Sequence, residues 1–347
     1  VVGMSGGVDS SVSALLLKKA GYRVIGAFMH NWDSSNTVSQ GCQAEKDWSD
    51  VASVCAKLDI PYYSFDFRKE YYAHVFEPFL EEYKKGNTPN PDILCNKKIK
   101  FNIFYKKAIE LGADYIATGH YARIKDNDLL KGLDESKDQT YFLYSVDRSC
   151  LSRVLFPIGE LQKQEVREIA RKYGLSVCDK KDSTGICFIG EKKFKKFINQ
   201  YIPSKPGKFC RLNGEEVGVH DGVWFYTIGQ RRQLGLGGEG KRWFVVKKDI
   251  KENIVYVERD SKHPQLYSSC LEATSINWLH EVDMKVGEKF SCKAKIRYRQ
   301  VEQECTVNIL DGKRVKVSFC DLQWGVSLQQ SVVFYDANQC IGGGVID

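Results

Sequence analysis

The feature that most constrains the fold is a short loop near the start of the chain, SGGVDS at residues 5–10. The residues before it, Val1 to Met4, are largely apolar, and an apolar helical pattern follows it without a gap. A strand, a glycine-rich loop and a helix in this order form an anion-binding site in an open parallel sheet, because the helix N-terminus supplies unpaired N–H groups. No lysine lies in the loop, which excludes the G-x-x-x-x-G-K-[ST] loop of kinase-type NTPases.

The residue types in this loop suit phosphate groups. Two glycines let the backbone approach phosphate oxygens closely, the two serines of the loop and the adjacent Ser11 add hydroxyl groups, and one aspartate could hold a metal ion bound to the same phosphates. These residues are Ser5, Gly6, Gly7, Asp9, Ser10 and Ser11. The alternative interpretation is a plain glycine turn in which a serine caps the helix.

The pattern along the chain predicts an α/β domain followed by two β domains. Over residues 1–200, strand-like apolar runs alternate with helical patterns, which is typical of a doubly wound parallel sheet. The expected strands are 22–29, 62–67 and 115–118, and the expected helices are 47–58, 102–111, 163–173 and 191–201, the last two as a helical appendage. Beyond residues 203–207, short strands predict a small β domain over 201–265 and a C-terminal β-barrel over 266–347.

The composition excludes several classes of protein. Lys and Arg outnumber Asp and Glu by 51 to 44, a mild bias toward a polyanionic partner. The 12 cysteines include no C-x-x-C pair, which argues against a zinc ribbon and a secreted disulfide framework. No apolar run approaches the roughly 20 residues of a membrane span. We therefore expect a cytoplasmic protein with no membrane partner, or an organellar protein, for example mitochondrial, if a leader precedes this sequence. A monomer is a separate expectation.

Two cysteines lie in segments that favour the reactive thiolate. In NTPNPDILCNKKIKF, residues 87–101, the prolines cannot continue a helix, so a helix beginning near Asp92 places Cys95 in its first turn, close to three lysines. In KKDSTGICFIG, residues 180–190, Cys187 follows a turn and two lysines. A buried structural cysteine is the alternative for each, and we assign that role to the other ten.

Motifs throughout the chain resemble those of one family, the tRNA-specific 2-thiouridylases. The SGGVDS loop resembles the pyrophosphate loop of the ATP pyrophosphatase superfamily to which that family belongs, whose members cleave ATP between the α- and β-phosphates. The further motifs are PNPDILCNKKIKF, ATGHY, KDQTYFL, DSTGICFIG, GVWFYTIGQR, RYRQ and CIGGG. The resemblance extends from Gly3 to the C-terminus.

The resemblance implies a reaction and its partners. The implied activity is ATP-dependent adenylation of the wobble uridine in tRNAs of the Lys, Glu and Gln type, followed by sulfur transfer from a cysteine persulfide. The implied partners are ATP with Mg²⁺, tRNA, and a sulfur-relay protein or cysteine desulfurase as donor. By the motif match, Cys187 carries the persulfide, Cys95 is its partner, and Asp92 is the acid beside the target base.

The motif match also implies binding residues. The nucleotide contacts would be Gly3, Met4, Ser5, Gly6, Gly7, Val8, Asp9, Ser10, Met29 and Gly119. The tRNA contacts would be Asn90, Pro91, Asp92, His120, Lys137, Asp138, Gln139, Arg297, Tyr298 and Gln330. No protein metal site is assigned; Mg²⁺ is expected with ATP, and Asp9 is its candidate ligand.

The chemistry can be argued from the reacting groups. A uracil carbonyl carbon is a poor electrophile, so its oxygen must first be esterified to AMP, which sulfur then displaces. Either a persulfide on Cys187 attacks directly, or Cys95 cleaves it and releases hydrosulfide; both routes end in a Cys95–Cys187 disulfide. Asp92, three residues before Cys95, could shuttle the proton. One Asp and two Cys could instead hold an iron–sulfur cluster.

A basic segment predicts a phosphate-binding surface. SCKAKIRYRQ, residues 291–300, alternates strictly, so a strand there would line up cations over roughly 20 Å. These cations are Lys293, Lys295, Arg297 and Arg299. A solvated face over an apolar core is the alternative. Arg231 and Arg232 add positive charge in the TIGQRRQLGLGG loop.

Two other functions remain open at this point. A different ATP pyrophosphatase, such as a small-molecule synthetase or amidotransferase, would need neither the two matched cysteines nor the basic β region. A non-catalytic RNA-binding protein with a decayed nucleotide site is the other alternative, and the intact loop with Asp9 argues against it.

Overall fold

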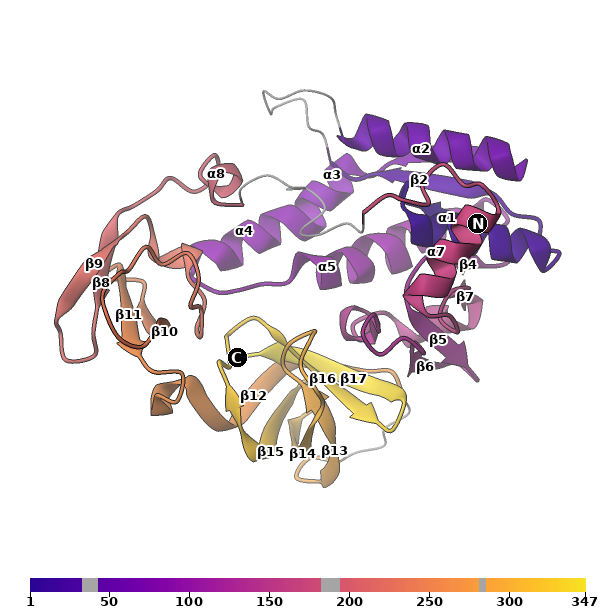
Figure 1. The fold of residues 1–347 in the computed structure, drawn as a ribbon. Coiled ribbons are helices and arrows are strands. Elements are labelled where there is room, and N and C mark those ends of the chain that lie inside the picture. The colour runs from indigo at the N-terminus through magenta and orange to yellow at the C-terminus, as the bar shows by residue number, and fades with distance from the viewer. Residues whose placement is uncertain (33–42, 182–193, 281–284) are drawn as a thin grey trace.

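The computed structural model describes residues 1–32, 43–181, 194–280 and 285–347. An N-terminal α/β domain lies along the top and right of Figure 1, a small β-sheet lies at the left, and a β-barrel lies below. No helix within the described ranges is both long and apolar enough to cross a lipid bilayer.

The α/β domain contains a parallel sheet with strand order β3-β2-β1-β4-β7. The strands are β1 (Val2–Met4), β2 (Gly26–His30), β3 (Tyr62–Asp66), β4 (Ile116–Ala117) and β7 (Val154–Leu155). Strands β2 and β3 lie on one side of β1, and strands β4 and β7 lie on the other side. The predicted doubly wound topology is therefore confirmed. Ligands bind where the strand order reverses, which is between the ends of β1 and β4.

Helices cover both faces of this sheet. One face packs against α1 (Val8–Lys19), α2 (Gln43–Leu58) and α7 (Lys163–Lys172), with Val12, Val54 and Val166 fully buried between them. The other face packs against helical segments that run in two continuous series. These are α3 (Arg68–Tyr71), the π-helical η1 (Tyr72–Phe76) and α4 (Glu77–Lys84), and then α5 (Pro91–Leu94), the π-helical η2 (Cys95–Phe104) and α6 (Tyr105–Glu110).

The helical appendage is described in part. The helix predicted over 163–173 is α7, and it begins at a capping box in which the Gln162 and Glu165 side chains each bond the other's backbone N–H. Within the range 191–201, the structure describes the short helix α8 (Phe194–Ile198).

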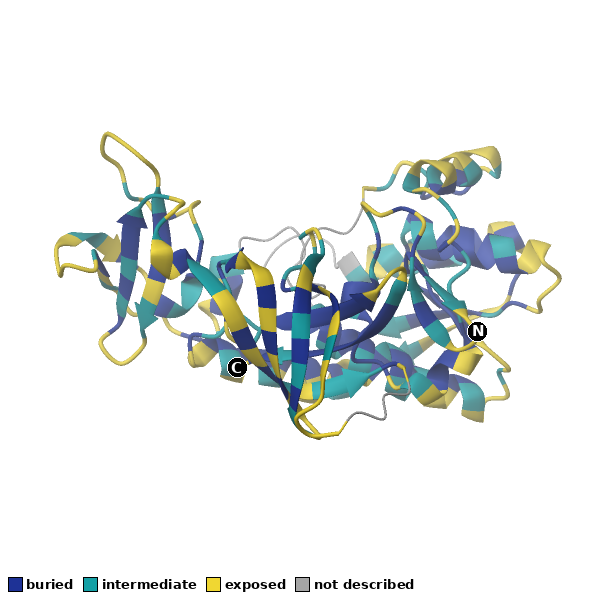
Figure 2. Ribbon diagram, turned by 90° about the horizontal axis from the view of Figure 1, so that it is seen from below, coloured by how far each residue is buried: buried dark blue, intermediate teal, exposed yellow. Residues whose placement is uncertain are grey.

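The small sheet has strand order β10-β11-β8-β9 and its own apolar core around Phe209 and Val245. Its strands are β8 (Gly207–Cys210), β9 (Glu216–His220), β10 (Trp243–Asp249) and β11 (Ile254–Arg259). The C-terminal strands close into a barrel because β12 pairs with both β15 and β17. These strands are β12 (Tyr267–Trp278), β13 (Lys289–Lys295), β14 (Gln303–Asp311), β15 (Arg314–Trp324), β16 (Ser331–Asp336) and β17 (Gln339–Ile346). Figure 2 shows buried and exposed residues alternating along them, as a closed barrel requires.

A hairpin of the α/β domain extends the barrel, which the sequence analysis did not predict. Strands β5 (Ala122–Lys125) and β6 (Asp128–Lys131) are joined by Asp126 and Asn127, both with positive φ, and Leu130 pairs with Gln339 of β17. Nearby, the Tyr141 hydroxyl donates to the Ser331 carbonyl of the barrel (2.9 Å). These contacts attach the barrel to the α/β domain.

The predicted strand over residues 291–300 is wrong in its second half. Strand β13 ends at Lys295, and the chain then turns, with the Ile296 N–H donating to the Gln300 side chain (2.9 Å). Lys295 is nearly buried and pairs with Asp138 (3.9 Å) and Glu302 (3.6 Å). Because of this turn and this pairing, the chain does not form the expected row of four cations over phosphates. The local alternation of the sequence revealed neither the turn nor the acidic partners of Lys295.

Candidate active site

The SGGVDS loop is ordered by its own hydroxyl groups. Gly7 caps α1, the Ser10 hydroxyl accepts from the Ser5 N–H (3.2 Å), and the Ser11 hydroxyl donates to the Gly7 carbonyl (2.8 Å). Gly6 has φ of +70°, and a Cβ built there would lie 2.6 Å from the carbonyl oxygen of Asp47 in α2. Only glycine fits this close approach, so the loop conformation follows directly from its sequence.

The other predicted nucleotide residues lie next to this loop. Gly119 follows β4, and a Cβ built on it would lie 2.6 Å from the backbone nitrogen of Ser10. Met29 lies in β2, one residue before its end, and its Cε is 3.4 Å from the position of a Cβ on Gly3. The structure thus brings the predicted nucleotide contacts together where the strand order reverses.

Asp9 has partners that the sequence analysis missed. Its carboxylate accepts hydrogen bonds from the Lys163 ammonium (2.7 and 2.9 Å) and from the Tyr121 hydroxyl (2.9 Å). No sequence motif pointed to Lys163, which is 154 residues away. In the described part of the chain, no cluster of three or more His, Cys, Asp or Glu residues could hold a metal ion. A carboxylate oxygen is a ligand type that Mg²⁺ prefers, so Asp9 stays the predicted ligand of an ion that would arrive with ATP.

The predicted helix start beside Cys95 is confirmed. Asn90 caps α5, where its side chain accepts from the Asp92 N–H (3.1 Å), and Cys95 follows as the first residue of η2 with 2% of its surface exposed. Burial raises the pKa of the Asp92 carboxyl, and the nearby Lys100 opposes this shift. Cys187 lies outside the described residues, so the structure leaves its distance from Cys95 untested.

We predict opposite effects of Asp92→Asn on stability and activity. Because the pKa of Asp92 is raised on folding, the folded protein holds this proton more tightly, and the free energy of unfolding falls as the pH rises above about 4. The variant should therefore gain stability relative to wild type between about pH 3 and about pH 7, while tRNA thiolation, the activity that the resemblance implies, should fall roughly 100-fold. Chemical denaturation across this pH range and nucleoside analysis measure the two effects.

Asp114→Asn, at an exposed carboxyl, is the matched control and should change neither quantity. A stability difference for Asp92→Asn that does not vary with pH would contradict the assignment of a raised pKa to Asp92.

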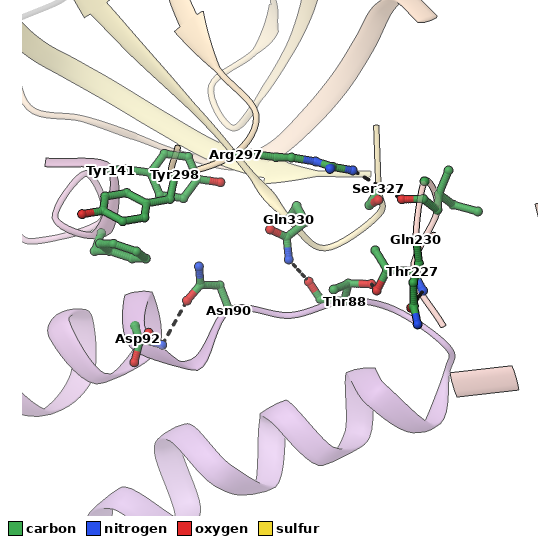
Figure 3. A pocket seen from close by; sticks show the side chains of 13 residues that line it. Thr88, Asn90, Asp92, Tyr141, Thr227, Gln230, Arg297, Tyr298, Ser327 and Gln330 are labelled. Atoms are coloured by element: carbon green, nitrogen blue, oxygen red, sulfur yellow. Dashed lines mark hydrogen bonds between the residues drawn. The ribbon is translucent and has the colours of Figure 1, made fainter. Parts of the chain in front are cut away.

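A pocket of about 530 Å³ lies where the three parts of the chain meet. Figure 3 shows its walls: Asn90 and Asp92 come from the α/β domain, Gln230 from the small β domain, and Arg297 and Tyr298 from the barrel. The described residues that line it are Thr88, Asn90, Asp92, Tyr141, Phe142, Thr227, Ile228, Gly229, Gln230, Arg297, Tyr298, Ser327 and Gln330. Its volume lies within the range of small-ligand sites.

Aromatic rings and a polar edge shape this pocket. The rings of Phe142 and Tyr298 lie 4.4 Å apart, and the Tyr298 hydroxyl donates to the Lys137 carbonyl (3.4 Å). Sequence reasoning missed Phe142, Thr227, Gln230 and Ser327, although the first three lie inside the quoted motifs KDQTYFL and GVWFYTIGQR.

Two of the predicted tRNA contacts also hold the three parts together. The Gln330 amide donates to the Thr88 carbonyl, which connects the barrel to the α/β domain. The Arg297 guanidinium donates to the carbonyls of Gly325 (2.7 Å) and Ile228 (3.3 Å), the second of which belongs to the small β domain. The pocket therefore depends on the same side chains that join its walls.

Other predicted tRNA contacts are buried. His120 is 8% exposed, bonds to the Thr118 hydroxyl (2.6 Å), and has a pKa well below the usual histidine value because it is buried. Asp138 is 4% exposed and accepts from the Thr140 hydroxyl (2.8 Å). Gln139 is half-buried, and its side chain accepts from the Tyr121 N–H (3.0 Å). His120 and Asp138 therefore lie beneath the surface of the site in this structure.

Known family models match nearly the whole chain. The "tRNA methyl transferase HUP domain" matches residues 1–191, the "tRNA methyl transferase PRC-barrel domain" matches 195–259, and the "Aminomethyltransferase beta-barrel domain" matches 268–346. Among solved structures, the U34-tRNA thiolase NcsA from Methanococcus maripaludis has a TM-score of 0.35 and 16% identity over 58% of this chain and 66% of that one, a likeness too low to carry an argument.

Several curated relatives match over the full length of this chain. The tRNA-specific 2-thiouridylase MnmA of Bacillus subtilis is 53% identical over 351 residues, covering 100% of this chain and 94% of that protein. The proteins of the same name from Halalkalibacterium halodurans and Staphylococcus saprophyticus are 52% and 51% identical, with the same coverage. The chain therefore belongs to the tRNA-specific 2-thiouridylase family.

Proposed function

We propose that this chain is an ATP-dependent tRNA sulfurtransferase that converts a wobble uridine to 2-thiouridine and releases AMP and pyrophosphate. The observation that supports this most directly is the pocket at the junction of the α/β domain, small β domain and barrel. It has Asp92 in its wall, and Cys95 begins the next helical segment after Asp92. A flipped-out base needs such a pocket, and the reaction needs an acid and a thiol beside it.

The first half-reaction uses the SGGVDS loop. The loop N–H groups and the hydroxyls of Ser5 and Ser10 bind the ATP phosphates, while the uridine 2-oxygen attacks the α-phosphorus. As that O–P bond forms, the bond to the β-phosphate oxygen breaks and pyrophosphate leaves. Mg²⁺ bound with ATP would neutralise phosphate charge, with Asp9 as the protein ligand.

The second half-reaction moves sulfur. The outer sulfur of a Cys187 persulfide, or hydrosulfide that Cys95 frees from it, attacks the uracil carbon and expels AMP. In both routes the Cys95 thiolate bonds to the Cys187 sulfur, and an external thiol must reduce the resulting disulfide. Asp92 suits proton transfer here, since its raised pKa lets it exchange a proton closer to neutral pH.

The remaining assignments belong to the same proposal. The substrates are tRNAs of the Lys, Glu and Gln type, whose wobble base would stack on Phe142 and Tyr298. A sulfur-relay protein or cysteine desulfurase supplies the persulfide to a cytoplasmic monomer with domains at 1–200, 201–265 and 266–347.

The test is nucleoside mass spectrometry of unmodified tRNA after incubation with the protein, ATP, Mg²⁺ and a persulfide donor. We expect 2-thiouridine at the wobble position and pyrophosphate release that depends on tRNA. Pyrophosphate release with no dependence on tRNA would favour a different ATP pyrophosphatase. Iron in the active protein, lost together with activity on chelation, would favour the cluster-based route.

The corrected position of Lys295 gives a prediction about salt dependence. A paired, nearly buried ammonium cannot release counterions on binding tRNA, so Lys295→Gln should leave the slope of log affinity against log salt unchanged. Replacing the exposed Arg231 and Arg232 by glutamine should reduce that slope by about 0.7 to 0.9 for each phosphate that the variant no longer neutralises. Filter binding at several salt concentrations measures both. If Lys295→Gln reduced the slope more than the replacement of Arg231 and Arg232, Lys295 would instead be a phosphate ligand.

A further inference from the structure

We infer that Lys163 is a further catalytic residue of the proposed reaction: its ammonium binds the pyrophosphate part of ATP and neutralises the charge that develops there as pyrophosphate leaves. Asp9 and Tyr121 are its positioning residues. This inference rests on the proposed function, and it concerns a side chain that no motif of the sequence analysis contained.

The fold brings Lys163 to the phosphate-binding loop. Lys163 is the first residue of α7, and Asp9 lies in the first turn of α1. The two helices pack against each other on the same face of the sheet, as Figure 1 shows. The Lys163 Nζ lies 2.7 and 2.9 Å from the Asp9 carboxylate oxygens, so its charge lies next to the loop that precedes α1.

The side chain is held in one place. The Lys163 N–H donates to the Asp134 carboxylate (2.9 Å), which fixes the start of α7. The ammonium lies 5.7 Å from the centre of the Tyr121 ring, and the Tyr121 hydroxyl holds the same Asp9 carboxylate (2.9 Å). With 12% of the side chain exposed, Lys163 is preorganised, and a preorganised charge stabilises a transition state most effectively.

Charge balance shows what Lys163 supplies. The loop of residues 5–10 has no cation of its own, and the acid within it, Asp9, would repel phosphates that bind beside it. Lys163 offsets that negative charge. Because an ammonium has three N–H donors, Lys163 can keep one bond to Asp9 while it donates another to a phosphate oxygen.

The step itself needs no proton from Lys163. The uridine oxygen forms its bond to the α-phosphorus, the electron pair of the broken bond leaves on the pyrophosphate oxygen, and the ammonium donates a hydrogen bond to that oxygen while it stays protonated. The interaction therefore strengthens as the bond breaks, which is the condition for lowering the barrier.

The experiment compares Lys163→Gln, Lys163→Arg and the matched control Lys172→Gln, at an exposed residue at the far end of the same helix. Lys163→Gln should lower kcat for tRNA-dependent pyrophosphate release roughly 100-fold, with partial recovery in Lys163→Arg and no change in Lys172→Gln. Calorimetry on the same proteins should show at least about tenfold weaker binding of inorganic pyrophosphate to Lys163→Gln, with adenosine binding unchanged.

Asp9→Asn separates positioning from direct contact. The amide oxygen can still accept from Tyr121, but the ion pair with Lys163 no longer forms. If Asp9 acts through Lys163, this substitution should lower kcat in the wild-type background and have a much smaller effect in Lys163→Gln.

Wild-type kcat and pyrophosphate affinity in Lys163→Gln would overturn the inference. So would an equal loss of pyrophosphate and adenosine binding in that variant, because it would indicate a purely structural role. If the wild-type protein releases no pyrophosphate with tRNA, the proposed function fails instead, and pyrophosphate binding still tests Lys163 by itself.

Discussion

The Cys187→Ser protein should accept no transferable sulfur, whereas Cys95→Ser should load sulfur but fail to complete a turnover. Cys187 carries the persulfide in the proposed reaction, and Cys95 forms the disulfide that releases the sulfur. Both variants should therefore lose steady-state formation of 2-thiouridine. Only the wild type should contain a Cys95–Cys187 disulfide after one turnover without reductant, which peptide mapping by mass spectrometry detects.

Other cysteines of the chain provide the controls. Cys178→Ser, at a half-buried thiol, should retain full activity. The expectation of a buried structural role is wrong for Cys270 and Cys320, which lie at exposed positions of β12 and β15 and should stay alkylatable throughout. If 2-thiouridine forms while Cys95 and Cys187 both remain alkylatable, the persulfide relay is wrong and a cluster-bound hydrosulfide becomes the better mechanism. A disulfide also requires the two Cα atoms to approach within about 7 Å, which gives a spectroscopic distance test.

The Gly6→Ala substitution should slow the nucleotide-dependent step roughly 100-fold and leave tRNA binding intact. Its Cβ would lie 2.6 Å from the Asp47 carbonyl oxygen, and the positive φ of 70° adds roughly 1–2 kcal/mol of backbone strain. The loop or α2 must therefore shift. A displacement of about 1 Å in a site that positions reactants costs roughly 100-fold in rate. Pyrophosphate release with saturating tRNA measures the effect, and filter binding measures tRNA affinity.

Gly312→Ala is the matched control for this prediction. Gly312 lies in the turn between β14 and β15, where a Cβ would meet no atom within 4 Å, so this variant should behave as wild type. Normal pyrophosphate release by Gly6→Ala would show that the close approach of the loop to α2 is not needed for catalysis.

Local patterns in the sequence were sufficient to predict the structure wherever a few neighbouring residues decide the backbone conformation. The glycines of SGGVDS and the prolines before Asp92 predicted the phosphate-binding loop and the helix start beside Cys95. The alternation of strand-like apolar runs with helical patterns predicted the doubly wound sheet. In each case backbone freedom, a missing N–H group or the apolar pattern of a single strand or helix constrains the structure over short distances.

The same reasoning failed where partners far along the chain decide the outcome. The alternation that predicted a strand through Arg299 did not reveal that Lys295 pairs with Asp138 or that the chain turns after it. The pairing of β6 with β17 was missed for a similar reason: one pair of residues, Leu130 and Gln339, joins strands that are far apart in the sequence.

What the sequence by itself determined is therefore the set of local elements, the phosphate-binding loop and, through its motifs, the family. Only the tertiary structure decided that Lys163 lies against Asp9 and that Asp92, Gln230 and Tyr298 line one pocket. The physical reason is that such contacts depend on how helices and domains pack. Packing is set by the total burial and charge pairing of many residues, whereas a turn or a helix start is set by the steric limits of a few.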